Sequence, residues 1–273
     1  MILEGDYMNS ILKRILIGAL AVSVPVGGGI FYFATRDSDK EDNNEIVEKK
    51  DEEKIDKGEE KKDDNQDHPK TDVVLNSDHL KKINLLKDNY NNDEIVGVVN
   101  IPNVLESIVV KHKDNEYYLN HGLDNKENLE GSVFLDYRND INSGRKNIIY
   151  GHNGNSEVLN IQFDKLENYY NKEFLVENPI IYLEDDKGVG TYQIFSVFVE
   201  TRDDNYLYLN FKSDSSWFEH ISYLKNKSMY NTDVNVDATD DVLILQTCSH
   251  NEEYSKYKDK YLVVVAKRIN YEY

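Results

Sequence analysis

The chain has 273 residues, of which 39% are hydrophobic and 30% charged, and its formal net charge at pH 7 is -19. This length and composition suit one globular domain with appended segments, and they exclude a membrane protein with many spans. The excess of acidic residues also argues against a nucleic-acid-binding protein, because binding to phosphates requires basic patches. We therefore expect no nucleic acid among its partners.

An apolar segment near the N-terminus predicts a single membrane-spanning helix. Residues 15–34 contain no charged side chain, and this is the length that a helix needs to cross the hydrocarbon core of a bilayer. Lys13 and Arg14 precede the segment, so the positive-inside bias places residues 1–14 in the cytoplasm. A cleaved signal peptide is the alternative, but its apolar region is usually shorter, at roughly 7–15 residues. We expect a signal anchor in the cell membrane, with the rest of the chain outside.

Residues 35–75 predict an acidic, disordered tether. Nearly every side chain in this segment is Asp, Glu, Lys, Asn or Gln, and acidic residues outnumber basic ones. Such a composition buries too little apolar surface to offset the entropy of ordering the chain. The tether would hold an extracellular domain, residues 76–273, away from the membrane.

This domain is predicted to be mostly β. Apolar side chains at helical spacing in residues 76–92, behind a Ser77-Asp78 cap signal, predict an N-terminal helix. A second, amphipathic helix begins near Ser213, in the long connection between the sixth and seventh strands. The strands are predicted from eight short β-branched or aromatic runs, at residues 95–101, 107–110, 117–119, 132–135, 147–150, 190–198, 242–247 and 261–266. Eight such runs indicate a closed barrel.

Cys248 is the single cysteine of the chain and directly follows the apolar run 242–247. Its thiol is therefore expected at a strand end, near the rim of the barrel. A lone thiol is either a small buried apolar group or a nucleophile. As a nucleophile it reacts as the thiolate, and because the pKa of a free thiol is about 8.5, it needs a basic or cationic neighbour.

His152 is one candidate for that neighbour. It follows the run 147–150 in the sequence Gly151-His152-Asn153-Gly154, where a glycine on either side permits a tight turn that aims the ring across the rim. His121 and His250 are the rivals, and spacing alone leaves the choice between the three histidines open.

Several strings of residues resemble those of the sortase family. Residues 245–249, Leu-Gln-Thr-Cys-Ser, resemble the TLxTC signature, and residues 150–153, Tyr-Gly-His-Asn, resemble the segment with the catalytic histidine. Residues 117–121, residues 131–139 and the inserted helix are similar to class B sortases in particular. The resemblance covers about residues 80–270. It implies an eight-stranded sortase-type β-barrel with Cys248 as nucleophile and His152 as acid/base.

The resemblance also implies a transpeptidation. The Cys248 thiolate would attack the Thr carbonyl of an NPxTx-like sorting signal on a surface protein, and His152 would protonate the leaving amine. An amine of peptidoglycan or its precursor would resolve the thioacyl intermediate, at a Gram-positive type of cell surface. The thioester conserves the energy of the peptide bond, so no cofactor and no metal are expected. The alternatives are a cysteine hydrolase of the same signal and a non-catalytic surface binding module derived from a sortase.

One position departs from the family pattern. Sortases have an Arg at the start of the last strand, where this chain has Tyr261. We hypothesise that the Tyr261 hydroxyl donates a neutral hydrogen bond in place of the charged one; the alternative is a rim aromatic without a catalytic role. Arg268 lies too far along the strand and on its other face to substitute, whereas Lys258 and Lys260 lie closer.

Three further positions are matched through the resemblance to the family. Asn120 and Tyr150 match groove-lining residues of class B enzymes, and each is equally consistent with a turn or packing role. Thr247 precedes the nucleophile and is expected to position the strand end.

Overall fold

The computed structural model of the chain describes residues 77–154, 162–201 and 204–273. The expected membrane helix at 15–34 and the expected tether at 35–75 lie outside these described residues. Within the described ranges, every helix is too short or too polar to span a bilayer.

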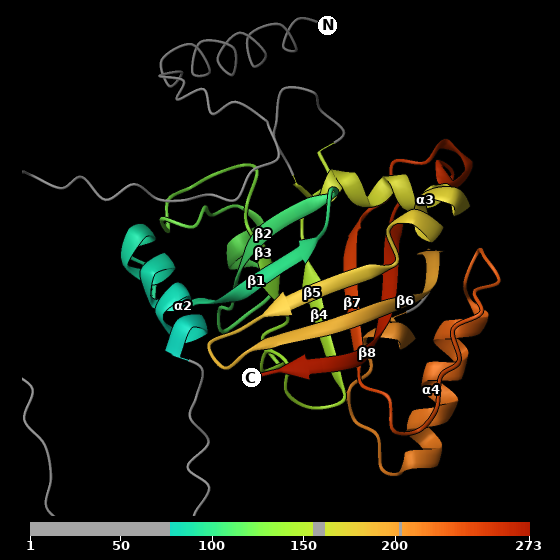
Figure 1. Cartoon of the computed structure of the whole chain (residues 1–273). Coiled ribbons are helices and arrows are strands. Elements are labelled where there is room, and N and C mark those ends of the chain that lie inside the picture. Colours follow the sequence, from blue (N-terminus) through green and yellow to red (C-terminus); the bar gives the residue numbers. More distant parts are fainter. Residues whose placement is uncertain (1–76, 155–161, 202–203) are drawn as a thin grey trace, which may run out of the picture. The chain divides into compact units, whose positions relative to one another are not determined.

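Eight strands close into a barrel, which confirms the predicted fold class (Figure 1). They follow each other around the barrel in the order β1-β2-β3-β4-β7-β8-β6-β5. The pairings β2–β3 and β4–β7 are parallel, and the other pairings are antiparallel. The bounds of the strands are β1 (Ile95–Ile101), β2 (Leu105–Val110), β3 (Val133–Leu135), β4 (Lys146–Tyr150), β5 (Ile180–Glu184), β6 (Val189–Glu200), β7 (Val242–Cys248) and β8 (Tyr261–Glu272).

Two details of the strand prediction were wrong. Residues 117–119 form a short 3-10 helix, η1 (Tyr117–Leu119), because the Asp114 carboxylate accepts hydrogen bonds from the backbone amides of Glu116 and Tyr117 and so starts a turn. The strand that the prediction missed is β5, which pairs with β1 and β6. The predicted number of eight strands was therefore correct, although one predicted segment is not a strand and one strand was missed.

Both predicted helices are present. Helix α2 (Ser77–Tyr90) lies beside β1, and helix α4 (Asp214–Asn226) lies on another side of the barrel in the connection between β6 and β7 (Figure 1). A capping box formed by Ser213 and Ser216 starts α4. The shorter helices are η2 (Gln162–Tyr170), α3 (Lys172–Glu177), η3 (Asn205–Leu207) and η4 (Glu252–Tyr254).

Strand β7 is buried on both faces, which makes it a rigid platform. Leu243 and Leu245 belong to the apolar core inside the barrel, whereas Val242 and Ile244 pack in a second cluster with Trp217 of α4. Burial of each large apolar side chain contributes roughly 1.5–3 kcal/mol. A strand covered on both faces needs a continuous apolar run rather than an alternating one, and the Val-Leu-Ile-Leu segment supplies it.

Candidate active site

The parallel pairing of β4 with β7 brings the candidate nucleophile and the candidate acid/base to the same rim. Tyr150 is the register partner of Gln246. His152 and Cys248 each follow two residues later, and since neighbouring parallel strands run in the same direction, both lie just beyond the end of the ladder. Residues two apart along a strand share a face, so both side chains emerge on the side of Tyr150 and Gln246.

Three hydrogen bonds tie the two strand ends together. The Gly151 amide donates to the Gln246 carbonyl at 3.1 Å, the Thr247 hydroxyl donates to the Gly151 carbonyl at 2.8 Å, and the Asn153 side-chain amide donates to the Cys248 carbonyl at 2.9 Å. Thr247 is buried, so its position supports the predicted role at the strand end. These bonds fix the backbone on both sides of the candidate pair.

A glycine is required at position 151. A Cβ atom there would lie 2.5 Å from the ring of Phe163, which no side chain tolerates. The turn that carries His152 therefore packs directly on the aromatic ring beneath it.

The His152 ring is oriented by a backbone carbonyl. Its Nε2 atom lies 2.5 Å from the carbonyl oxygen of Leu119. A carbonyl can only accept, so Nε2 carries a proton and Nδ1 is the nitrogen left to take one up. In many cysteine enzymes a side chain orients the histidine, whereas here the main chain of η1 does so.

The rival histidines are engaged elsewhere. His121 stacks on Tyr117 and its Nδ1 lies 2.7 Å from the Tyr117 carbonyl, while the His250 amide donates to Glu167. Among the described residues, His152 is the one histidine that lines the cavity at Cys248.

Opposing effects act on the Cys248 thiol. The side chain is exposed, yet partial burial by the surrounding protein raises the pKa of the thiol. The positive charge of Lys260 acts in the opposite direction and lowers it. A positive charge near a thiol favours the thiolate, which is the reactive form.

Tyr261 lies directly across the ladder from Cys248. The two residues are register partners at the end of the β7–β8 pairing. Burial is the main cause that raises the pKa of Tyr261, and nearby negative charges raise it further. Its hydroxyl therefore keeps its proton. Arg268 is far from this end, because its guanidinium pairs with Asp241 and donates to the Asn142 carbonyl. The expectation that Arg268 points away from Cys248 is confirmed.

Cys248 and His152 face a common pocket of about 300 Å³. The structure brings Tyr150, Thr247 and Tyr261 to this pocket as well; Asn120 is not among the residues that line it, and its role in the groove stays a prediction. Asn115 and Leu119, from the same segment, do line the pocket. The remaining lining residues are Phe134, Gly151 and Gln246.

A buried carboxylate holds two walls of this pocket. Asp136 is fully buried and accepts hydrogen bonds from the Tyr150 hydroxyl at 2.8 Å and from the Asn115 amide at 3.2 Å. Arg138 donates to both of its oxygens, at 2.8 and 2.7 Å. Although burial raises the pKa of Asp136, the hydrogen bonds from Arg138 and Tyr150 outweigh it and leave the pKa lowered. The charged form therefore orients the Tyr150 ring and the Asn115 amide.

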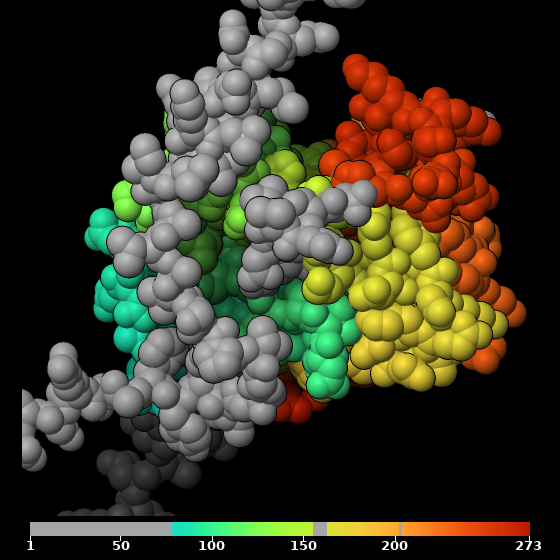
Figure 2. Space-filling view, turned by 90° about the horizontal axis from the view of Figure 1, so that it is seen from above, coloured from blue at the N-terminus to red at the C-terminus, as the bar shows by residue number. Residues whose placement is uncertain are grey.

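The segment after Cys248 is fastened to the neighbouring helical segment. The Ser249 and Tyr170 hydroxyls lie 2.6 Å apart, and the His250 amide donates to the Glu167 carboxylate at 2.7 Å. Figure 2 shows the segment after β7 in red next to the yellow segment of η2 and α3. Across residues 77–154, 162–201 and 204–273, no three His, Cys, Asp or Glu side chains are grouped to hold a metal ion.

A thiol and an imidazole at adjoining strand ends, above a small pocket, are the arrangement of a cysteine acyl-transfer enzyme. The sortase domain model matches residues 99–269. Sortase B of Staphylococcus aureus is 34% identical over 180 residues, which cover 65% of this chain and 71% of the relative.

Two solved structures extend the comparison. The substrate complex of Staphylococcus aureus sortase B matches with a TM-score of 0.62 and 32% identity, covering 70% of this chain and 85% of the other. A sortase B complexed with triglycine matches with a TM-score of 0.60 and 30% identity, covering 71% and 94%. The chain belongs to the sortase family, and it is a cysteine transpeptidase.

Proposed function

We propose that this sortase cleaves an NPxTx-like sorting signal near the C-terminus of surface proteins and transfers them to an amine of peptidoglycan or its precursor. The observation that carries the proposal is the β4–β7 register, which brings Cys248 and His152 to one pocket. The relatives support the two substrate classes, since one solved sortase B holds a substrate and another holds triglycine.

In the first half-reaction, the Cys248 thiolate attacks the carbonyl carbon of the Thr residue. A C–S bond forms, the peptide C–N bond breaks, and the leaving amine takes a proton from His152. The bond from His152 Nε2 to the Leu119 carbonyl keeps the imidazolium in place until it gives up the proton from Nδ1. The Tyr261 hydroxyl would donate a neutral hydrogen bond toward the developing oxyanion, and the register pairing of Tyr261 with Cys248 supports this role.

In the second half-reaction, an acceptor amine attacks the thioester carbonyl. The C–N bond forms as the C–S bond breaks, Cys248 leaves as the thiolate, and the amine proton passes to His152. Water in place of the amine would give hydrolysis, which is the chemistry of the alternative cysteine hydrolase.

The test uses the full chain and a labelled NPxTx peptide, with and without triglycine. Mass spectrometry is expected to detect an acyl adduct on Cys248, and a ligated product only when triglycine is present. An adduct that gives free acid alone, even at high triglycine concentration, would identify the hydrolase. A chain that forms no adduct but binds the peptide, with unchanged affinity in Cys248→Ala, would identify the binding module.

The proposal also places the enzyme in the cell membrane, with residues 15–34 as the anchor and the catalytic domain outside. The uncharged apolar run supports this placement. Protease treatment of intact protoplasts tests it: the catalytic domain is expected to be digested, and its full protection would contradict an extracellular location.

A further inference from the structure

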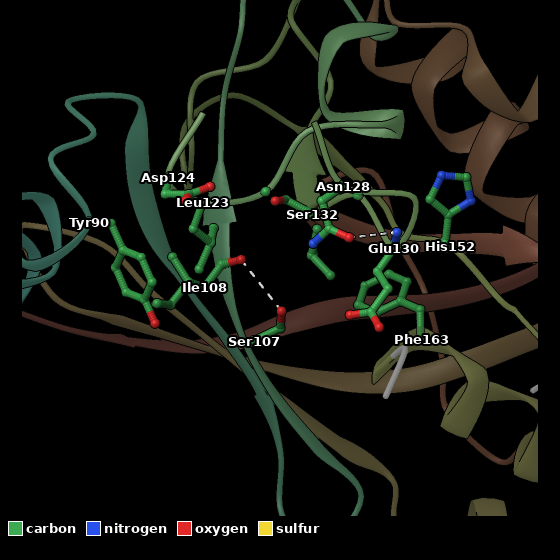
Figure 3. A pocket seen from close by; sticks show the side chains of 13 residues that line it. Tyr90, Ser107, Ile108, Leu123, Asp124, Asn128, Glu130, Ser132, His152 and Phe163 are labelled. Carbon is green, nitrogen blue, oxygen red and sulfur yellow. Dashed lines mark hydrogen bonds between the residues drawn. The ribbon is translucent and has the colours of Figure 1, made fainter. Parts of the chain in front are cut away.

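The carbonyl that orients His152 belongs to the last residue of η1, so its position depends on how this short helix is held. One side of η1 is covered by a loop that lines the cavity of Figure 3 together with His152. In this loop Gly131, with φ of +60°, packs so closely that a Cβ atom would lie 2.5 Å from the Tyr118 carbonyl oxygen and 2.9 Å from the Leu119 carbonyl oxygen. The Ser132 amide donates to the same Tyr118 carbonyl at 2.9 Å. The loop thus fixes the backbone of η1 from one side.

The side chain of Tyr118 anchors η1 from the other side. It is almost fully buried, and its ring belongs to the apolar cluster of Ile95, Val110 and Phe134. Its hydroxyl lies 2.7 Å from the Glu94 carboxylate and accepts a hydrogen bond from the Asn92 side-chain amide at 2.9 Å, while the Asn125 side-chain oxygen is farther away, at 3.1 Å. Burial raises the pKa of Tyr118 well above its ordinary value, so the hydroxyl keeps its proton and donates it to Glu94.

The Glu94 carboxylate also reaches the second aromatic residue of η1. Its Oε1 atom lies 2.7 Å from His112 Nδ1, and the His112 ring stacks on Tyr117 with 4.3 Å between the ring centroids. Tyr117 stacks in turn on His121, at 3.9 Å. The backbone of Glu94 is held as well, since its carbonyl accepts from the amide of the residue after β2 at 2.8 Å. One carboxylate beside β1 therefore supports both tyrosines of η1, one directly and one through a histidine.

We propose that Glu94 is a positioning residue for His152 and acts through η1. The inference rests on the proposed function, which gives His152 the acid/base role. By holding Tyr118 in place, the Glu94 carboxylate keeps the next residue's carbonyl, that of Leu119, at the His152 ring. That carbonyl can only accept, so it keeps the ring proton on Nε2. If η1 moved, the neutral ring would lose this acceptor, and its proton would divide between the two nitrogens.

The first test removes one hydrogen bond from either side, in the full chain. Glu94→Ala and Tyr118→Phe should each slow formation of the Cys248 acyl adduct about tenfold, because a catalytic group held loosely loses its orientation, while the KM of the peptide stays unchanged. Since both variants break the same bond, the double variant should be little slower than either one. Glu94→Gln keeps an acceptor for the Tyr118 hydroxyl and should retain most of the wild-type rate.

The matched control is Tyr192→Phe, which makes the same chemical change at another buried tyrosine. The Tyr192 hydroxyl donates to the Asn142 side chain at 2.8 Å. Tyr192 is the register partner of Arg268, whereas Cys248 lies at the opposite end of the β7–β8 ladder. This control should lower the thermal midpoint about as much as Tyr118→Phe does, and it should leave the rate of acylation unchanged.

NMR of the His152 ring nitrogens is a readout that a loss of stability alone does not move. The signals are assigned by their absence from the spectrum of His152→Gln. Wild type and Tyr192→Phe should show the neutral ring with its proton on Nε2, whereas Glu94→Ala and Tyr118→Phe should show a mixture of the two tautomers.

Three results would overturn the assignment: unchanged ring signals in Glu94→Ala and Tyr118→Phe, an equal loss of rate in Tyr192→Phe, or fully additive losses in the double variant. A wild-type chain that forms no acyl adduct would instead refute the proposed function. The ring signals do not depend on activity, so they would still show whether Glu94 positions His152.

Discussion

The two ends of the β7–β8 ladder use different chemistry. At the rim end, Cys248 faces the neutral side chain of Tyr261. At the far end, Arg268 pairs with Asp241 and Lys267 pairs with Asp240 at 3.2 Å. The start of β8 thus has Tyr261 at the position where the family resemblance predicts an Arg, and Arg268 of the same strand lies at the far end, where it pairs with a carboxylate.

We infer from this difference that the far end of the ladder contributes mainly to the stability of the fold, and the rim end mainly to its reactivity. The ion pairs at the far end are partly buried, with side-chain exposures of 27% for Arg268 and 23% for Asp241, so loss of one partner leaves a charge poorly solvated. At the rim, the backbone on either side of Cys248 is held by neutral hydrogen bonds, from the Thr247 hydroxyl to the Gly151 carbonyl and from the Asn153 side-chain amide to the Cys248 carbonyl. Changes at the two ends should therefore separate in their effects.

The largest effect is expected from removing the reactive groups themselves. Cys248→Ala should abolish formation of the acyl adduct, and His152→Gln should slow it by about 10²–10⁴-fold, because proton transfer to the leaving amine is lost. Mass spectrometry of the adduct measures both rates. The thermal midpoint of Cys248→Ala should stay close to that of the wild type, since the side chain is exposed. Adduct formation at another residue in Cys248→Ala would show that the nucleophile is misassigned.

At the far end, Arg268→Met is expected to lower the free energy of unfolding by about 1–3 kcal/mol, because Asp241 loses its charged partner. Urea denaturation measures this loss. Acylation by the folded variant should be unchanged. The matched control is Arg145→Met, whose ion pair with Asp214 is more exposed and should contribute less than about 1 kcal/mol. A variant that keeps its stability but loses acylation would reverse the roles of the two ends.

Much of the rim was predictable from local sequence. An apolar run followed directly by Cys248, and another followed by Gly151-His152, place both groups at strand ends. The pairing of those strands was not predictable in this way, because β4 and β7 are joined through β5, β6 and α4 and no local pattern sets their register. Only the motifs that resemble a family favoured His152 over His121 and His250.

The conformation of residues 117–119 was not predictable from their β-branched or aromatic character. Side chains in a strand alternate between its two faces, so a strand at 117–119 would turn different side chains toward the pocket than a helix does. The structure instead forms η1 there, and Leu119 at its end lines the pocket together with Asn115 from the segment before it. The signal was the Asp114 side chain, which caps this turn.

Asp136 shows a second limit of prediction from the sequence. Residues 131–139 resemble class B sortases, but nothing else in their sequence marks them, and a lone aspartate there suggests a surface position. Its burial and its bonds to Tyr150 and Asn115 depend on segments that are distant in the sequence. No spacing rule predicts such a network.

Tyr261 tests whether a neutral group suffices at the rim. Tyr261→Phe should slow acylation about tenfold if the hydroxyl donates to the developing oxyanion. Removing a donor from an enclosed oxyanion hole costs more, but this site is open to solvent. Tyr261→Arg should restore at least the wild-type rate, and its charge should lower the pKa of the Cys248 thiol and shift the pH–rate profile to lower pH. Pre-steady-state adduct formation measures both. An unchanged rate in Tyr261→Phe would leave this residue as a rim aromatic.

The smallest effect concerns Lys260, the cation whose charge acts on the thiol. Its charge lowers the pKa of Cys248 against the effect of burial, so Lys260→Gln should raise that pKa. Less thiolate is then present near neutral pH, and the rate of alkylation by iodoacetamide should fall about twofold at pH 7, with the acidic limb of the profile moved to higher pH. Above the raised pKa the two proteins should react equally fast, and added salt should shrink the difference because it screens the partly exposed charge of Lys260.

Lys258→Gln is the control for this change, because it removes the same charge from the same segment and Lys258 is not among the groups that affect the thiol. Lys260→Arg should keep the wild-type profile. If Lys260→Gln and Lys258→Gln shift the profile equally, the general charge of the segment acts on Cys248. If neither shifts it, the thiolate depends on His152 alone, and the rim end of the ladder operates without help from any lysine of this segment.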